Sequence, residues 1–245
     1  MSNIHDYATF AEVSGTTFAV TPMSVELDYA QALAVSTLSV FASTDDMTPV
    51  IGGIRLELQR YAGDHWHVDA WSTDRYVAAH MSFDLPIEAA DADDYDRAAY
   101  TIPAGEFAAF TKSAPKNAPV QIRGLRFQGE ESRGGFLRFS AGGTVRETRE
   151  VGGNYPPLEK LFKDGEEPIP AGIMLQPSYL AKLAKVRLGG ETPVQAGKVP
   201  WSFSAQPYET RTLSSGSVRH GPILATREDA GVTVRVLIQP HLKLR

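Results

Sequence analysis

The feature that most constrains the fold is an order of elements that the sequence repeats three times. Each pass starts with an extended segment, continues with a short amphipathic helix and ends with about three extended segments. The passes begin near residues 23, 100 and 172. Because repeated β-α-β-β-β units form sheets whose helices collect on one face, the sequence predicts an α+β fold rather than a doubly wound one.

The first pass has the clearest helix signal. Asp28 is a good N-cap, and Gln31 stands three residues later, at the spacing of a capping box. The helix is expected to end near Ala42, before the breakers around Pro49. Its apolar face is predicted to comprise Ala30, Leu33, Ala34, Thr37, Leu38 and Phe41. The strands expected in this pass are 23–28, 53–59, 65–71 and 76–85, and an acid-rich loop, 88–96, follows them.

The second pass repeats this order. Residues 100–102 are expected to be extended, and Pro103 suits the first turn of a helix. Phe107 and Phe110 share one face of that helix, and Pro115 ends it. The strands expected after it are 120–127, 135–140 and 144–151.

In the third pass, 173–175 is expected to be extended and Pro177 opens a helix. One side of this helix is predicted to carry Tyr179, Leu180, Leu183 and Val186. The strands expected next are 199–205, 223–227 and 232–240.

Composition excludes several classes of site. The chain has no cysteine, so disulfides, thiol nucleophiles and cysteine-bound metals are ruled out. A net charge of −5 disfavours nucleic acid and acidic membranes as partners of the molecule as a whole, although a local basic strip stays open. The start has no signal-peptide pattern, and the apolar-rich run 29–42 is too short to span a bilayer. We therefore expect a soluble, cytoplasmic protein with no membrane partner.

Signals for catalysis are weak. The sequence has no phosphate-binding P-loop, no GxSxG and no HExxH. His65, His67 and Asp69 alternate along one strand, so they share a face at a spacing that metal ligands use. A solvated strand face is the favoured interpretation, and a metal enzyme is kept as an alternative. We expect no enzyme activity, no cofactor and no metal.

Basic residues are unevenly distributed over the three helices. The first helix has none, whereas the second and third carry lysine or arginine within or just beyond them. Such side chains could contact DNA phosphates without reading sequence, although an ordinary exposed helix face is the simpler interpretation. The candidate DNA-binding residues are Lys112, Lys116, Lys182, Lys185 and Arg187.

Five segments resemble, in the same order, motifs of the bacterial DNA polymerase III β sliding clamps, with the actinobacterial members most similar. They are 45–57 (DDMTPVIGGIRLE), 72–79 (STDRYVAA), 154–161 (NYPPLEKL), 175–180 (LQPSYL) and 237–242 (LIQPHL). The resemblance implies a clamp fold with helices on the inner face and antiparallel sheets outside. It divides the chain into an N-terminal segment (1–22), a clamp domain like the family's middle domain (23–163) and a shortened second lobe (164–245).

The resemblance also implies a function. Clamps have no catalysis; they encircle duplex DNA and tether a replicative polymerase through a pocket for short peptides. Its partners here would be double-stranded DNA, a DNA polymerase, a clamp loader and further copies of the chain. Carried over by position, the pocket residues are Thr73, Asp74, Arg75, Tyr76, Tyr155, Pro156, Leu237, Ile238, Pro240 and Leu242.

The chain departs from the family pattern at three pocket positions. Val77, Lys163 and Gln239 stand where the family has arginine, proline and methionine. The chain is also short, which favours a trimeric over a dimeric ring and fits a compact phage-encoded version. The alternative is a clamp-like protein that forms no ring and binds or modulates replication proteins.

Overall fold

The computed structural model describes residues 20–61, 65–92, 97–127, 135–207, 211–212 and 218–240. Its strands are β1 (Val20–Leu27), β2 (Gly53–Tyr61), β3 (His65–Thr73), β4 (Val77–Pro86), β5 (Ala90–Ala92), β6 (Arg97–Pro103), β7 (Val120–Phe127), β8 (Phe136–Ala141), β9 (Thr144–Arg149), β10 (Ser202–Ala205), β11 (Arg211–Thr212), β12 (Val218–Arg219), β13 (Ile223–Asp229) and β14 (Val232–Ile238). Its helices are α2 (Tyr29–Thr37), α3 (Ala104–Ser113), α4 (Pro177–Leu183) and α5 (Pro193–Ala196). Short 3-10 turns are η2 (Leu38–Phe41), η3 (Pro49–Gly52), η4 (Ile87–Ala89) and η6 (Leu158–Leu161).

The strands form two large sheets. One has five strands in the order β5-β1-β7-β8-β9, and the other has seven in the order β10-β13-β14-β4-β3-β2-β6. All the strand pairs within them are antiparallel. The predicted α+β class, with antiparallel sheets and few helices, is confirmed.

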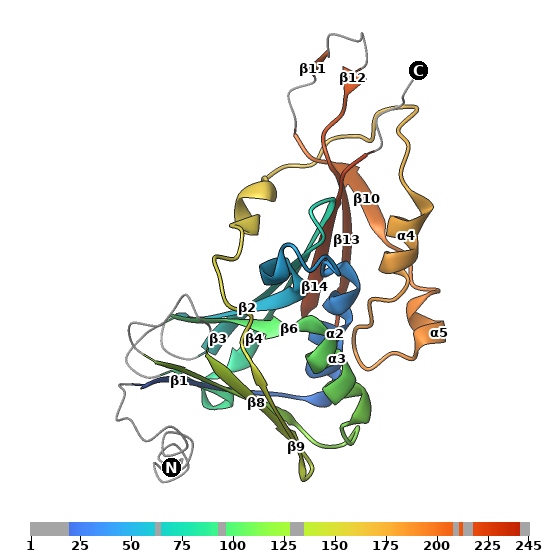
Figure 1. The fold of residues 1–245 in the computed structure, drawn as a ribbon. Helices are drawn as coiled ribbons and strands as arrows, with labels where there is room; N and C mark the ends of the chain where they lie inside the picture. Colours follow the sequence, from blue (N-terminus) through green and yellow to red (C-terminus); the bar gives the residue numbers. More distant parts are fainter. Residues whose placement is uncertain are drawn as a thin grey trace.

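The first two repeats exchange their leading strands. β1 leads the first repeat but pairs with β7 of the second, and β6 leads the second repeat but pairs with β2 of the first. Each repeat therefore completes the sheet of the other. Figure 1 shows α2, α3, α4 and α5 on one side of the seven-stranded sheet and the yellow turn η6 on the other side.

Helix α2 begins as the sequence predicts. Asp28 Oδ1 accepts a hydrogen bond from the Gln31 N–H at 2.7 Å, and Gln31 Oε1 accepts one from the Asp28 N–H at 3.0 Å. The turn η2 continues the helix to Phe41, which is fully buried together with Leu38. The helix carries no charged side chain, so its exposed surface is neutral.

One hydrophobic core joins both sheets to α2 and α3. Phe107 and Phe110 are buried on the same face of α3, as predicted, and both pack on Phe139 of β8 with ring centroids 5.2 and 5.6 Å apart. Pro103 is the N-cap of α3 and not a residue of its first turn. A single core of this kind fixes the two repeats as one body.

The third repeat differs from the first two. Residues 173–175, expected to be a strand, pair with no described strand, because extended backbone becomes a strand only where a partner supplies the ladder. This repeat therefore has α4, the strands β10, β13 and β14 of the large sheet and the short pair β11 and β12, but no leading strand within the described residues. Leu183 and Val186 are buried as predicted, whereas Leu180 is 40% exposed. The buried face of α4 is thus narrower than the sequence predicts.

Two local expectations need correction. Part of the acid-rich segment 88–96 is not a loop, because β5 pairs with β1 from Ala92–Met23 to Ala90–Val25; residues 93–96 lie outside the described residues. Helix α5 was not expected at all, although Thr192 and Gln195 form a capping box at its start. Its four residues are too few to give a periodic pattern.

The seven-stranded sheet continues from the first repeat into the third. Strand β14 pairs with β4 from Thr233–Ser82 to Ile238–Val77, across the expected boundary at residue 163. The segment after α4 is fixed to β13 by the buried Arg227, which donates to the Val186 carbonyl at 3.2 Å and pairs with Glu191. No helix in the described part of the chain is long and apolar enough to span a membrane.

Candidate functional site

The turn between β3 and β4 is held by its own side chains. Thr73 Oγ1 donates to the Val77 carbonyl at 2.8 Å, and Asp74 Oδ1 accepts from the N–H groups of Tyr76 and Val77 at 3.1 and 2.9 Å. Arg75 has a φ of +79°, a left-handed conformation that non-glycine residues rarely adopt. The network of the turn therefore holds one residue in an unfavourable backbone region and directs its side chain outward.

Arg75 connects this turn to the segment before η3. Its guanidinium pairs with Asp45 at 2.9 Å and donates to the Thr48 hydroxyl. The pKa of Asp45 lies below its ordinary value because its carboxylate accepts the Met47 N–H, a contribution to which the charge of Arg75 adds. The first two motifs of the resemblance are therefore in direct contact.

The segment 154–162 crosses the face of the seven-stranded sheet that is turned away from the helices. The Tyr155 hydroxyl donates to the Trp71 carbonyl at 3.1 Å, and burial raises the pKa of this tyrosine. The rings of Trp71 and His80 stack with their centroids 3.9 Å apart, and Phe162 packs edge-on against both. A small separate core lies beneath, formed by Trp71, Ala78, Leu158, Leu224 and Leu237.

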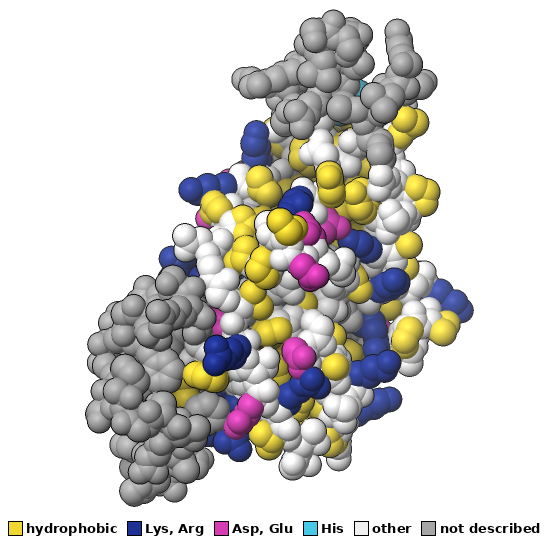
Figure 2. Space-filling view, in the orientation of Figure 1, with side chains coloured by type: hydrophobic (Ala, Val, Ile, Leu, Met, Phe, Trp, Pro, Cys, Tyr) yellow, Lys and Arg dark blue, Asp and Glu magenta, His cyan; other side chains and the backbone are white. Residues whose placement is uncertain are grey.

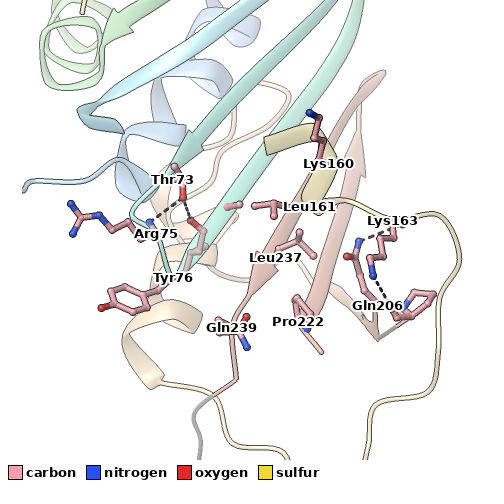
Figure 3. A pocket seen from close by; sticks show the side chains of 13 residues that line it. Thr73, Arg75, Tyr76, Lys160, Leu161, Lys163, Gln206, Pro222, Leu237 and Gln239 are labelled. Carbon is pink, nitrogen blue, oxygen red and sulfur yellow. Dashed lines mark hydrogen bonds between the residues drawn. The ribbon is translucent and has the colours of Figure 1, made fainter. Parts of the chain in front are cut away.

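A cavity of about 320 Å³ lies where this segment, the β3–β4 turn and the ends of β10 and β14 meet (Figure 3). Its floor is mainly apolar, and basic side chains stand at opposite sides. The lining residues are Thr73, Arg75, Tyr76, Val77, Ala78, Lys160, Leu161, Lys163, Gln206, Pro207, Pro222, Leu237 and Gln239.

The expected pocket residues fall into three groups. Thr73, Arg75, Tyr76 and Leu237 line the cavity, Asp74 and Tyr155 support its walls, and Pro156 and the buried Pro240 do not line it. Leu242 lies outside the described residues.

One expected residue points elsewhere. Ile238 is fully buried in the main core, because successive side chains of β14 point to opposite faces and Leu237 already faces the cavity. The expectation that both neighbours face the pocket is wrong for Ile238.

Several lining residues were missed. Lys160 and Leu161 lie within the quoted motif 154–161, so its spacing could have identified them. Gln206, Pro207 and Pro222 reach the cavity from either side of the β10–β13 connection, and no local pattern marks them. Val77, Lys163 and Gln239, the three departures from the family pattern, all line it.

The expected DNA-binding residues also differ among themselves. Lys112, Lys116 and Lys185 are exposed and form no ion pair within the described residues. Lys182 is half-buried, with its Nζ 2.5 Å from Asp74 Oδ2, and therefore supports the β3–β4 turn. The Arg187 Nε donates to the Glu191 carbonyl at 2.6 Å. The exposed lysines thus form the free part of the set, and Lys198, which sequence reasoning missed, is a further exposed lysine just after α5.

One of these lysines, Lys116, lies beside the start of the neutral helix α2. A hollow of about 510 Å³ is lined by Tyr29 at the start of α2, by Lys116 and by Gly190, so the loop after α3 and the turn after α4 approach α2 from two sides. Figure 2 shows Lys and Arg side chains gathered along the edge that carries α3, α4 and α5. We call the exposed surface of α2, α3 and α4 with these lysines the helix face.

The alternating histidines of β3 do not assemble a metal site. His67 Nδ1 lies 2.7 Å from Asp84 Oδ1, and His80 Nε2 lies 2.6 Å from Asp69 Oδ1. Within the residues that the structure covers, no group of three potential ligands could hold an ion. His67 and Asp69 instead form hydrogen bonds to residues of the neighbouring strand β4.

No protein-family model matches the chain, and no curated protein does. Several solved structures are similar to it. Caulobacter crescentus pol III beta has a TM-score of 0.55 at 15% sequence identity, over 91% of this chain and 65% of its own. A Helicobacter pylori beta clamp has a TM-score of 0.54 at 10% identity, over 92% and 68%. A Pseudomonas aeruginosa DnaN sliding clamp bound to griselimycin has a TM-score of 0.54 at 12% identity, over 89% and 65%.

The likeness establishes the fold. The chain has the fold of the bacterial DNA polymerase III β sliding clamps, as the sequence motifs predict, at low sequence identity. It spans about two thirds, 65%, of the length of the Caulobacter protein.

Proposed function

We propose that this chain is the subunit of a DNA sliding clamp, a non-enzymatic ring that encircles duplex DNA and tethers a replicative polymerase. The observation that carries the proposal is the fold, which is shared with β sliding clamps over about nine tenths of the chain. The basic helix face and the cavity on the opposite side of the sheet supply the two surfaces that such a protein needs.

The helix face would contact DNA through its phosphates. Lys112, Lys116 and Lys185 are exposed cations that form no ion pair within the described part of the chain, and Arg187 follows Lys185 two residues later. Contacts of this kind are electrostatic and carry no sequence information, so the ring could move along the duplex. Lys182 would contribute to DNA binding only indirectly, because its ammonium group is already paired with the carboxylate of Asp74.

The cavity would hold the polymerase and, in turn, the clamp loader. An extended peptide suits a groove with an apolar floor and a few polar groups that fix its direction. Thr73, Arg75, Tyr76 and Leu237 would contact the peptide, while Asp74 and Tyr155 hold the walls in place.

The proposed ring rests on the expected division of the chain into a clamp domain (23–163) and a shortened second lobe (164–245). Two lobes per chain favour a trimer, because a closed ring requires repeated heterologous contacts whose rotation adds up to a full turn. The helix face would line the hole, and both sheets would lie outside.

Retention on circular DNA tests encirclement. We expect the loaded protein to stay on a nicked circular plasmid during gel filtration and to be lost when the plasmid is linearised, because only a topological link slides off an end.

Lys112→Glu with Lys116→Glu should weaken binding and lower the salt dependence by about two phosphate contacts. Arg138→Glu with Arg149→Glu, on the sheet face away from the helices, is the matched control and should bind as the parent does. Equal retention on circular and linear plasmids contradicts the proposal.

A second candidate is a clamp-like protein that binds replication proteins without forming a ring. The third repeat favours it, since its described part lacks a leading strand and α4 leaves Leu180 exposed. This candidate predicts peptide binding in the cavity without any difference between circular and linear DNA.

A further inference from the structure

One carboxylate holds the wall of the cavity and also reaches the helix that carries basic residues. Asp74 Oδ1 accepts the N–H groups of Tyr76 and Val77, two residues that line the cavity, at 3.1 and 2.9 Å. Its second oxygen, Oδ2, lies 2.5 Å from Nζ of Lys182 on α4. The two surfaces that the proposed function requires are therefore joined through a single side chain.

The contact between α4 and the β3–β4 turn is partly shielded from water. The side chains of Lys182 and Asp74 are 23% and 18% exposed, and Lys182 Nζ lies 5.9 Å from the centroid of the Tyr179 ring. Desolvation raises the pKa of Tyr179, and the neighbouring charge of Asp74 adds to this shift. Because a partly buried pair is screened less than an exposed one, it restrains the turn more firmly than a surface pair would.

Lys182 is also close to a phosphate that binds at Lys185. The two lysines are three residues apart, and the Lys185 N–H donates to the Lys182 carbonyl at 3.0 Å, so they lie one turn apart. Lys185 is exposed and forms no ion pair in the described part of the chain. A phosphate held by Lys185 would compete with Asp74 Oδ2 for the ammonium group of Lys182, because both are anionic oxygen acceptors.

The turn is strained, so it can relax when a restraint is lost. Arg75 has a φ of +79°, and its N–H donates to the Thr73 hydroxyl at 3.1 Å. Loss of the Lys182 contact frees one oxygen of Asp74 and weakens the network that holds this conformation. Relaxation of Arg75 would displace Tyr76, the next residue of the cavity wall (Figure 3).

We propose that Lys182 couples the two surfaces: DNA on the helix face draws this lysine from Asp74, and the β3–β4 turn then loosens and weakens the hold of the cavity on a peptide. Because coupling between two sites is reciprocal, an occupied cavity weakens DNA binding by the same factor. This inference rests on the proposed function and adds a regulatory link between its two sites.

Hydrogen–deuterium exchange read by mass spectrometry tests the link, because the amides of Tyr76 and Val77 are protected by Asp74. A short blunt DNA duplex is the probe, and the fluorescence anisotropy of a labelled copy measures its binding to the same protein. We expect saturating duplex to speed the exchange of the fragment 73–79 about fivefold in the parent protein, as the loss of one partly exposed ion pair would give.

Four variants separate the ion pair from the rest of the helix face. Lys182→Met and Asp74→Asn both remove the pair, and the asparagine keeps an oxygen for the two N–H groups; their exchange should be the same with and without duplex. Lys182→Arg keeps the positive charge and should keep the response. Lys112→Met removes an exposed lysine of α3 rather than α4, and this matched control should also respond at saturating duplex.

The outcomes distinguish the link from the function on which it rests. Duplex that binds the parent protein without changing the exchange of the turn overturns the link and leaves both proposed surfaces standing. A response that survives in Lys182→Met and Asp74→Asn overturns the role of the ion pair. Duplex that does not bind overturns the DNA surface and the link together.

Discussion

Arg75 is the residue at which the candidate site stores backbone strain. Its φ of +79° is imposed by the hydrogen bonds of Thr73 and Asp74 around it, and its side chain is 51% exposed. Backbone conformations of this kind cost of order 1 kcal/mol or more for a residue with a Cβ and persist where the surroundings determine them, commonly at functional sites. The strain therefore belongs to the wall of the cavity and not to the core.

Comparison of glycine and alanine at this position measures the strain. Arg75→Gly should be about 1 kcal/mol more stable than Arg75→Ala, because both lose the pair with Asp45 and only glycine tolerates the positive φ. Urea unfolding provides the two free energies. The order should reverse at Tyr76, which lies outside the left-handed region and is the matched control. Equal stability of the two Arg75 variants would contradict the turn geometry.

Sequence reasoning worked best at this scale where the signal is local. The pair Asp28 and Gln31 predicted a capping box, and the box is present because both partners lie within one turn. Ile238 was misplaced because position in a motif was used without the alternation of the strand. Lys182 was taken for a free cation, since its partner Asp74 is distant in the sequence and close only in the fold.

At the scale of elements, the least regular part of the molecule is the segment after α4. It is fixed by polar contacts: Arg227 reaches from β13 to Glu191 and to the Val186 carbonyl, and the Leu188 N–H donates to Glu191 at 3.1 Å. Burial raises the pKa of Glu191, but the hydrogen bonds from Arg227 and Leu188 outweigh it, so the pKa lies below its ordinary value of 4.5. This carboxylate therefore contributes stability in its charged form.

Glu191→Gln should lower the free energy of unfolding at pH 7 by about 2–3 kcal/mol, because the buried Arg227 loses its counter-charge. A group with a depressed native pKa stabilises above its unfolded pKa, and this contribution is lost as pH falls through the native pKa. The difference between parent and variant should thus shrink as the solution is acidified below the ordinary pKa of a glutamate, as urea unfolding followed by circular dichroism would measure. Glu228→Gln, at an exposed position on β13 next to Arg227, is the control and should show little effect at either pH. A difference that is the same at acidic and at neutral pH would contradict the assigned role of Glu191.

Elements with a strong period were predicted and those that depend on distant partners were not. Most strands of the first two repeats and the helices around Phe107 and Leu33 were predicted from the spacing of apolar residues, and the burial of those residues agrees with it. Residues 173–175 and β5 were assigned wrongly, since whether an extended segment joins a ladder depends on its neighbour in the sheet. The cavity is a product of tertiary structure, so its far wall had no signal in the sequence.

At the scale of the whole molecule, three repeats combine into one fold. Two of them exchange leading strands, while the third attaches to the first through β14 and β4. The order of elements predicted this class of fold, and the comparison with β sliding clamps confirms it. The number of chains in the assembly does not follow from one chain, because it depends on surfaces that become contacts only between copies.

Electron microscopy of the negatively stained protein at micromolar concentration tests the central claim most directly. We predict closed rings, three chains of 26.7 kDa in each, with a central hole wide enough for a DNA duplex. Compact particles of single-chain size, or arcs that stay open, would contradict the account of a protein that encircles DNA.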